Sequence, residues 1–234
     1  TQAVMMATPA DLEDFAVGFS LSEQVIKTPA DIHSLDVIET KLGIELRMDL
    51  ATPNAERLAQ RRRAMAGPVG CGLCGIESLK EAMRPVPRVD ADFRVSQRDI
   101  MGAVTAIERA QALNRETRAV HAAAFWRAGH ELVFVREDVG RHNALDKTSG
   151  AIARAGMSAR DGVVVISSRV SIEMVQKAAI MGAPILIAVS APTALAVRAA
   201  EESGITLAAV ARDDGFEVFS HPDRIEFDAR QNVA

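Results

Sequence analysis

The chain has 234 residues, of which 48% are hydrophobic and 25% charged, and its net charge is −4. This composition is typical of a globular protein with one large domain or two small ones. The acidic balance argues against non-specific binding to nucleic acid, and the sequence has no apolar run of the roughly 20 residues that cross a bilayer. We therefore expect neither nucleic acid nor a membrane as a partner.

The N-terminal part of the sequence predicts a helix followed by a β-hairpin. Thr8 as N-cap, Pro9 at the first helical position and an acidic first turn indicate a helix over residues 9–26. Alternating apolar and polar residues over 34–50, interrupted by a turn at 41–43, indicate a hairpin. We expect residues 1–66 to form a smaller α+β domain, and we expect further residues upstream of Thr1. The arginines at 61–63 form either a solvated face or a docking surface for an acidic partner.

The rest of the sequence predicts alternating helices and strands. A short helix over 76–83 is followed by a helix over 96–113 that Ser96 caps. Two strands, over 119–126 and 131–138, then pair around a turn at Ala128 and Gly129. Beyond them we expect helices at 142–155, 171–182 and 192–204, and strands at 162–168, 184–190, 205–211 and 216–220. Uniformly apolar strands between helices are typical of an α/β fold with a largely parallel sheet covered on both faces.

Both cysteines of the chain, Cys71 and Cys74, lie in the stretch GPVGCGLCG at residues 67–75. This stretch opens a glycine-rich loop and linker that we place at 67–95, between the two domains. Two thiols at this spacing can bind a metal, exchange electrons or carry sulfur, and each of these reactions requires a thiolate. Glycine neighbours let the backbone approach a substrate closely, whereas they pack poorly around a pair of buried cysteines. A functional pair is therefore favoured over a structural one.

The alternatives for this cysteine pair differ in what else they require. A structural zinc site requires four ligands, but the sequence has no third cysteine and no closely spaced histidine pair. A zinc-dependent deaminase would also need an H-x-E motif, which is absent from the sequence. Thioredoxin-like chemistry would place the motif directly after a strand, and here it follows a linker. Two cysteines are also too few for a disulfide framework, which favours a reducing, cytoplasmic setting.

Two polar stretches follow apolar strands and open helices. The stretch REDVGRHNALDK, residues 136–147, places Arg141, His142 and Asn143 at a predicted helix start, where cations oppose the helix dipole unless an anion lies among them. The stretch SSRVSIEMVQK, residues 167–177, places Arg169 and Ser171 in the same position of the next helix. Ligands bind beyond the carboxyl ends of the strands in open α/β sheets, so the two loops indicate a nucleotide-like anionic ligand. Polar turns with ordinary helix capping by Ser171 are the alternative.

Taken in order, GCGLCGIESL, REDVGRHNALDK, SSRVSIEMVQKA and APTALAVRAAEESGITL resemble the FdhD/NarQ family, the accessory sulfurtransferases of formate dehydrogenase. TPADLEDFAVGFSLSE near the start is similar to the same family, so the resemblance covers about residues 3–227. It implies a sulfur carrier that takes persulfide sulfur from a cysteine desulfurase and passes it to the bis-molybdopterin guanine dinucleotide cofactor. That cofactor, bound as a substrate, then enters the catalytic subunit of formate dehydrogenase, and GDP or another guanine nucleotide would mimic it.

The resemblance also assigns residues and an architecture. Cys71 would carry the persulfide, with Cys74 assisting or sharing that role, and no structural metal is expected. The family's cofactor-binding segment matches VARDDGFEVFSHP, which implies contacts from Val210, Ala211, Arg212, Asp213, Asp214 and Gly215. Residues 96–234 would form a cytidine-deaminase-like, three-layer α/β domain, and the chain would form a homodimer.

The segment from Val210 to Gly215 departs from the family pattern. Family members often carry a glycine and a further basic residue where Asp213, Asp214 and Gly215 stand. Two carboxylates can accept hydrogen bonds from a guanine base but repel phosphate. Two rival functions remain beside sulfur transfer: a chaperone that binds the molybdenum cofactor without transferring sulfur, and a zinc-dependent, deaminase-like hydrolase.

Overall fold

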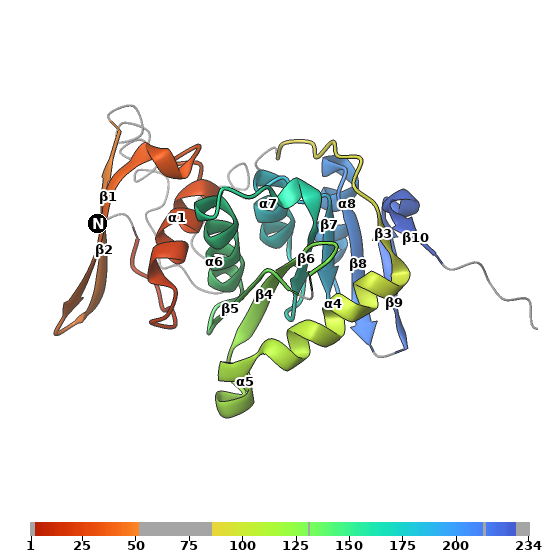
Figure 1. Cartoon of the computed structure of the whole chain (residues 1–234), viewed down its shortest axis with the longest axis horizontal. Coiled ribbons are helices and arrows are strands. Elements are labelled where there is room, and N and C mark those ends of the chain that lie inside the picture. The colour runs from red at the N-terminus through yellow and green to blue at the C-terminus, as the bar shows by residue number, and fades with distance from the viewer. Residues whose placement is uncertain (1–2, 52–85, 131, 213, 228–234) are drawn as a thin grey trace, which may run out of the picture.

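In a computed structural model the chain forms a mixed α/β fold (Figure 1), described for residues 3–51, 86–130, 132–212 and 214–227. The α-helices are α1 (Leu12–Ser22), α4 (Gln97–Ala110), α5 (Ala112–Thr117), α6 (Arg141–Arg154), α7 (Ile172–Ile180) and α8 (Ala194–Ser203). Short 3-10 helices lie at Pro29–Asp31, Ala159–Asp161 and Pro222–Arg224. The strands are β1 (Ile32–Thr40), β2 (Gly43–Leu50), β3 (Val95–Ser96), β4 (His121–Trp126), β5 (Phe134–Asp138), β6 (Val163–Ile166), β7 (Ile185–Ala188), β8 (Thr206–Arg212), β9 (Gly215–Ser220) and β10 (Ile225–Glu226).

The central sheet has six strands in the order β5-β4-β6-β7-β8-β9. β6, β7 and β8 are parallel neighbours, whereas β4 runs antiparallel to both β5 and β6, and β9 runs antiparallel to β8. The predicted pairing of β4 with β5 is confirmed, but the prediction of a largely parallel sheet is wrong, because β4 also runs antiparallel to β6 and β9 runs antiparallel to β8. The predicted alternation of helices and strands is confirmed from β6 to β8.

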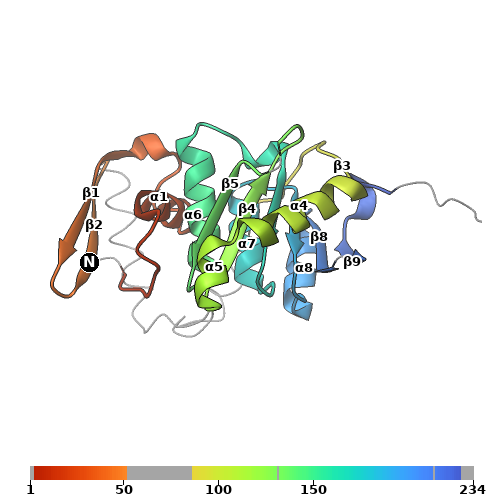
Figure 2. The same cartoon turned by 60° about the horizontal axis from the view of Figure 1, so that its bottom comes forward.

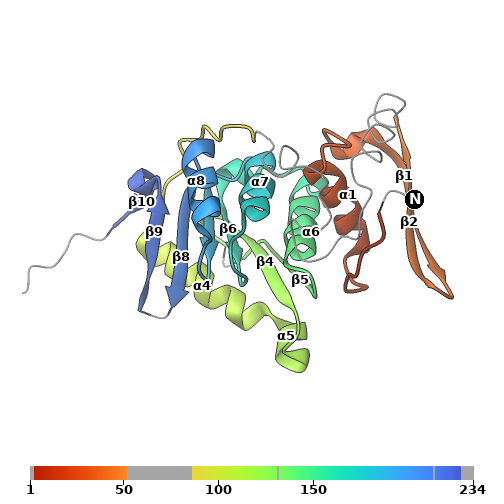
Figure 3. The same ribbon diagram turned by 180° about the vertical axis from the view of Figure 1, so that it is seen from behind.

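Alternate strand residues face two separate hydrophobic layers. On one face of the sheet, Ile166 and Leu186 pack with Leu145 of α6 and with residues of α7 and α8. On the other face, Val165 packs in the same cluster as Ile100 of α4. Figure 3 shows α6, α7 and α8 side by side over one face, and Figure 2 shows α4 lying across the other. β6 and β7 are therefore buried on both faces of the sheet, which explains their continuous apolar sequences.

The predicted hairpin is confirmed as β1 and β2, which pair antiparallel around the turn at 41–42. Its base packs on α1, where Ile32 and Leu50 contact a small cluster that contains Val17. The helix preceding it is shorter than predicted. The prediction of a helix over 9–26 capped by Thr8 is wrong, since α1 begins at Leu12 after Asp11, whose φ is 52°.

Long-range contacts decide where α1 begins, and a local turn decides where it ends. The backbone N–H of Thr8 donates to the Asp138 carboxylate (2.9 Å), and its hydroxyl accepts from the N–H of Val139 (3.1 Å), so Thr8 is held away from the helix start. At the other end, Gln24 takes a φ of 55°, and the N–H of Val25 donates to the Ser20 carbonyl. The chain thereby leaves the helix and buries Val25 against α1.

The backbones of α1 and α6 touch at two glycines. A Cβ added to Gly18 would lie 1.8 Å from the carbonyl oxygen of Asp146, and one added to Gly150 would lie 1.9 Å from that of Asp14. These positions leave no room for any side chain, which is the condition for such close approach of two helices. The N-terminal helix is thus packed directly onto the central domain. The predicted domain boundary at residue 66 lies outside the described residues and stays a prediction.

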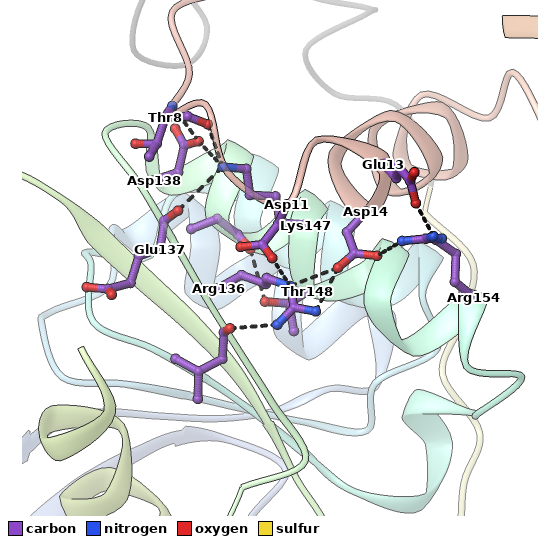
Figure 4. A network of polar contacts seen from close by, with 12 residues as sticks. Thr8, Asp11, Glu13, Asp14, Arg136, Glu137, Asp138, Lys147, Thr148 and Arg154 are labelled. Atoms are coloured by element: carbon purple, nitrogen blue, oxygen red, sulfur yellow. Dashed lines mark hydrogen bonds and ion pairs between the residues drawn. The ribbon is translucent and has the colours of Figure 1, made fainter. Parts of the chain in front are cut away.

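Ion pairs flank this helix contact (Figure 4). The buried carboxylate of Asp14 accepts from Arg136 (Nη2, 2.7 Å) and from Arg154 (Nη1, 2.6 Å). Arg154 also pairs with Glu13, and Arg136 lies 3.4 Å from Asp11. Because Asp14 is buried and bridges two arginines, it fixes α1 against both β5 and α6.

Candidate functional site

The candidate site is the edge of the sheet at which β5, β6, β7 and β8 end. In the strand register His121, the first residue of β4, pairs with Asp138, the last residue of β5, and Ala123 pairs with Ile166 at the end of β6. β7 and β8 run parallel to β6 and therefore end at the same edge. The first turns of α6, α7 and α8 begin there. The predicted site residues before and at these helix starts are thus placed at one edge of the sheet.

Asp138 builds the turn from β5 into α6. It is fully buried, and one carboxylate oxygen accepts from the N–H of Gly140 (2.8 Å) and from the Asn143 amide (2.9 Å). The other oxygen accepts from Thr8 and from Lys147, whose ammonium lies 2.7 Å away and is also completely buried (Figure 4). A buried carboxylate with this many donors is held in a single position. Asp138 is therefore structural, as the turn interpretation of this stretch predicted.

Asn143, a predicted binding residue, takes part in this turn. Its amide nitrogen donates to Asp138 and to the carbonyl oxygen of Met6 (2.8 Å). Both amide hydrogens are used within the protein. Asn143 thus joins the N-terminal segment to the start of α6, and any ligand contact would be left to its carbonyl oxygen.

Glu137, the other acidic residue of this turn, also has a structural role. Its two carboxylate oxygens accept from the N–H groups of Leu113 and Asn114, each at 2.8 Å. These are free N–H groups in the first turn of α5, where a negative charge is favourable. Glu137 therefore caps α5 and is directed away from the start of α6.

His142 is the central side chain at the start of α6. Its pKa is lowered from 6.5 to about 4, mainly by burial and then by the charges of Lys177 and Arg141, while the carboxylate of Glu173 acts in the opposite direction. The imidazole is therefore neutral at pH 7. Its Nε2 atom is buried and has no hydrogen-bond partner in the described part of the chain.

His121 lies beside the same group of charges. Its pKa is lowered by burial first and then by Arg141 and by Arg169 of the loop after β6. Both arginines therefore act on one imidazole at the edge of the sheet. The two cation-bearing loops that the sequence predicted are close neighbours in space.

The loop after β6 supplies two further polar side chains. Ser171 is the N-cap residue of α7, but its hydroxyl makes no capping hydrogen bond. Its Oγ atom and the Oε2 atom of Glu173 are buried, and neither has a hydrogen-bond partner in the described part of the chain. Ordinary helix capping by Ser171, the alternative that the sequence left open, is thus wrong. Arg169 in the same loop is exposed to solvent.

A buried ion pair lies below these groups. The Lys177 ammonium donates to both carboxylate oxygens of Asp146 at 2.8 Å, and the Ser22 hydroxyl donates to one of them at 2.6 Å. Lys177 also lies 6.0 Å from the centre of the Phe19 ring. α1, α6 and α7 are therefore joined beneath the candidate site by one charged network.

The third predicted segment lies further along the same edge, at the end of β8. Val210 has a φ of 55°, which is strained for a β-branched residue, and the pairing with β9 shifts its register between Ala209 and Arg212. The Arg212 guanidinium donates to the carbonyl oxygens of Val189 and Ala211. Ala211 is completely buried in the core, so it can contact a ligand only through its backbone.

Of the remaining predicted site residues, the structure describes two and not the other three. Asp214 is exposed, and Gly215 has a φ of 150°. Cys71, Cys74 and Asp213 lie outside the described residues. His121, Lys177 and Glu173 are residues of this edge that the sequence did not single out. The predicted strand pair over 119–126 and 131–138 is the signal that could have found His121, because it places this residue near the end of the second strand, beside the start of α6.

Comparison with known proteins places the chain in a family. It belongs to the FdhD/NarQ family, whose model matches residues 1–226. It is 55% identical over 226 residues to the sulfur carrier protein FdhD of Agrobacterium fabrum, covering 96% of this chain and 83% of the relative. It is 48% identical over 231 residues to the sulfur carrier protein FdhD of Cupriavidus necator, covering 98% of this chain and 80% of the relative.

A solved structure agrees with this assignment. The fold matches a crystal structure from Desulfotalea psychrophila, assigned as a formate dehydrogenase accessory protein, with a TM-score of 0.69 and 27% identity. The match covers 94% of this chain and 82% of that one. Among the helices that the structure describes, none is long and apolar enough to cross a membrane.

Proposed function

We propose that this protein is a cytoplasmic sulfur carrier that transfers persulfide sulfur to the bis-molybdopterin guanine dinucleotide cofactor. The sulfur would come from a cysteine desulfurase, and the sulfurated cofactor would serve the catalytic subunit of formate dehydrogenase. The relatives named sulfur carrier proteins, at up to 55% identity, support the carrier role. The related structure assigned as a formate dehydrogenase accessory protein supports the link to that enzyme. A cytidine-deaminase-like layout of residues 96–234 and a homodimer are part of the same proposal.

The chemistry is assigned to Cys71 and Cys74. The Cys71 thiolate attacks the outer sulfur of the desulfurase persulfide, so that Cys71–S–SH forms and the desulfurase cysteine leaves as a thiolate. No electrons are gained or lost in this exchange. For delivery, the Cys74 thiolate attacks the inner sulfur of Cys71–S–SH, which forms a Cys71–Cys74 disulfide and releases HS⁻. The sulfide, with one proton, replaces an oxo group of the cofactor as water, and a cellular dithiol then reduces the disulfide.

The observation that carries the binding part of the proposal is the polar edge of the sheet. Arg141 and Arg169 act together on His121, and three buried polar atoms nearby have no partner in the described residues. Four strand intervals separate β5 from β8, and at about 4.8 Å each they make this edge about 19 Å long. The edge is thus long enough for an extended dinucleotide whose other end lies at Val210–Gly215. The cofactor binds as a substrate, and its phosphates would lie at the cationic starts of α6 and α7.

The carrier role is tested by mass spectrometry of the intact protein. After incubation with a cysteine desulfurase and cysteine, we expect a gain of about 32 Da, which corresponds to one sulfur atom and is removed by a dithiol. Cys71→Ser should abolish this gain. Cys74→Ser should retain it, because only Cys71 accepts the sulfur.

The rival function is a chaperone that binds the cofactor but carries no sulfur. It predicts no gain in mass for the wild type and unchanged binding of a guanine nucleotide by both variants. A wild-type protein that gains no sulfur from an active desulfurase would therefore refute the carrier role. Loss of the gain in Cys74→Ser but not in Cys71→Ser would reverse the two roles.

A further inference from the structure

Three unpartnered polar atoms at the starts of α6 and α7 require an explanation. They are His142 Nε2, Ser171 Oγ and Glu173 Oε2, and each is buried without a hydrogen bond to the described residues. More than nine in ten buried polar groups in proteins have a partner, and leaving one without a partner destabilises the protein. Atoms in one neighbourhood that share this cost are best explained by a ligand that supplies the missing partners.

The neighbourhood is cationic apart from Glu173. Arg141 and Lys177 lower the pKa of His142, and Arg141 and Arg169 lower that of His121. The starts of α6 and α7 add the positive ends of two helix dipoles. These features suit phosphate, but the Glu173 carboxylate does not, because it only accepts hydrogen bonds and repels an anion. Glu173 therefore needs a part of the ligand that donates N–H groups.

We infer that Glu173 is a specificity-determining residue that binds the amino edge of a 2-amino-4-oxopyrimidine ring. Guanine and pterin share this ring, which presents a ring N–H and an exocyclic amino group side by side, next to a carbonyl oxygen. Glu173 accepts from the N–H groups, while His142 Nε2 or the Ser171 hydroxyl donates to the carbonyl oxygen. This inference rests on the proposed function, because the bis-molybdopterin guanine dinucleotide cofactor carries both rings.

The geometry gives each side chain a role that its chemistry allows. A neutral imidazole donates from one nitrogen, and burial keeps His142 neutral at pH 7. A carboxylate and a neutral donor together match guanine or pterin. Adenine presents an acceptor where guanine has its ring N–H, so it would leave Glu173 unpaired and be rejected.

A structural role for Glu173 is the alternative. An acidic residue in the first turn of α7 stabilises the helix through its dipole. A carboxylate exposed to solvent would stabilise the helix dipole equally well, however, and the dipole does not explain why one oxygen of Glu173 is buried without a partner. The two explanations differ in whether Glu173 distinguishes between bases.

The test compares GDP, IDP and ADP binding to the wild type and to Glu173→Gln by calorimetry. IDP lacks the exocyclic amino group, so the wild type should bind it about tenfold or more weakly than GDP, and ADP more weakly still. Glu173→Gln should bind GDP about 10–100-fold more weakly, and its preference for GDP over IDP should fall to about threefold or less. Glu202→Gln, an exposed glutamate of α8, is the matched control for the loss of one charge and should leave the preference unchanged.

A second arm distinguishes guanine from pterin. Competition by 6-hydroxymethylpterin is measured with the same two proteins. If Glu173→Gln weakens pterin binding and leaves the preference for GDP over IDP intact, Glu173 binds the pterin ring. A loss of that preference instead assigns Glu173 to guanine.

Two results would overturn the inference. Unchanged pterin competition together with an unchanged GDP preference would show that Glu173 recognises neither ring. If Glu173→Gln changes the affinities for GDP, ADP and pyrophosphate by the same factor, Glu173 acts only through its negative charge and recognises no ring. A wild type that binds none of these probes would refute the cofactor site as well, and the mass measurement on Cys71 would then decide separately whether the carrier role holds.

Discussion

His142 makes the stability of this protein sensitive to mild acid. Its pKa is about 4 in the folded chain and 6.5 in the unfolded one, because the buried imidazole lies beside Lys177 and Arg141. As the pH falls below about 6.5, the unfolded chain binds a proton that the folded chain does not, so stability falls with pH. Between about pH 7 and about pH 5 this linkage removes about 2 kcal/mol from the free energy of unfolding.

The substitution His142→Gln tests this value without placing a charge at the site. Urea unfolding of the variant and the wild type, without ligand, gives the free energy of unfolding at both pH values. The wild type should lose about 2 kcal/mol more than the variant on acidification. Burial raises the pKa of Asp146, which acts in the opposite direction, but Asp146 is common to both proteins and cancels in the difference.

The control is His130→Gln in the turn between β4 and β5, where the imidazole is exposed to water. It should lose as much stability on acidification as the wild type, because no buried imidazole is removed. Equal losses in the wild type and His142→Gln would refute the reasoning, since they would mean that His142 is protonated as easily in the folded state as in the unfolded one.

Two further predictions concern packing. Gly18→Ala should destabilise the protein by several kcal/mol or prevent folding, since the new Cβ would lie 1.8 Å from the Asp146 carbonyl oxygen; Gly102→Ala in α4, where nothing lies within 4 Å, should be neutral or stabilising by up to about 1 kcal/mol. Thermal unfolding compares the two, and similar melting temperatures would contradict the close helix contact. Lys147→Met should cost about 3–5 kcal/mol because it leaves Asp138 charged and buried. Limited proteolysis should then cut near Thr8, which loses the ammonium bonded to its carbonyl oxygen; a resistant variant of wild-type stability would exclude this role.

The sequence alone determined most of the local structure. Ser96 caps α4 as predicted, with its hydroxyl accepting from the N–H of Asp99 (3.0 Å). The apolar run Ile185–Ala188 forms a buried strand, and residues 32–50 form a hairpin. Each of these features depends on side chains a few residues apart, so their pattern is visible in the chain. The sequence also placed Arg141, His142, Arg169 and Ser171 after strands, which is enough to locate them at one edge of a sheet.

Only the tertiary structure decided the strand order and the partners of the charged residues. β4 lies between β5 and β6 and runs antiparallel to both, which brings His121 close to the loop after β6 as well as to the end of β5. The hydrogen bond from the Thr8 N–H to the Asp138 carboxylate holds Thr8 outside α1, although 130 positions separate the two residues. The partner of a buried charge is set by which distant elements pack together and by the cost of leaving that charge unpaired. The periodicity of a short segment does not show which distant elements pack together or which charges they bury. The sequence therefore predicted the helices and strands, whereas the packing of α1, α6 and α7 determined how the site is assembled.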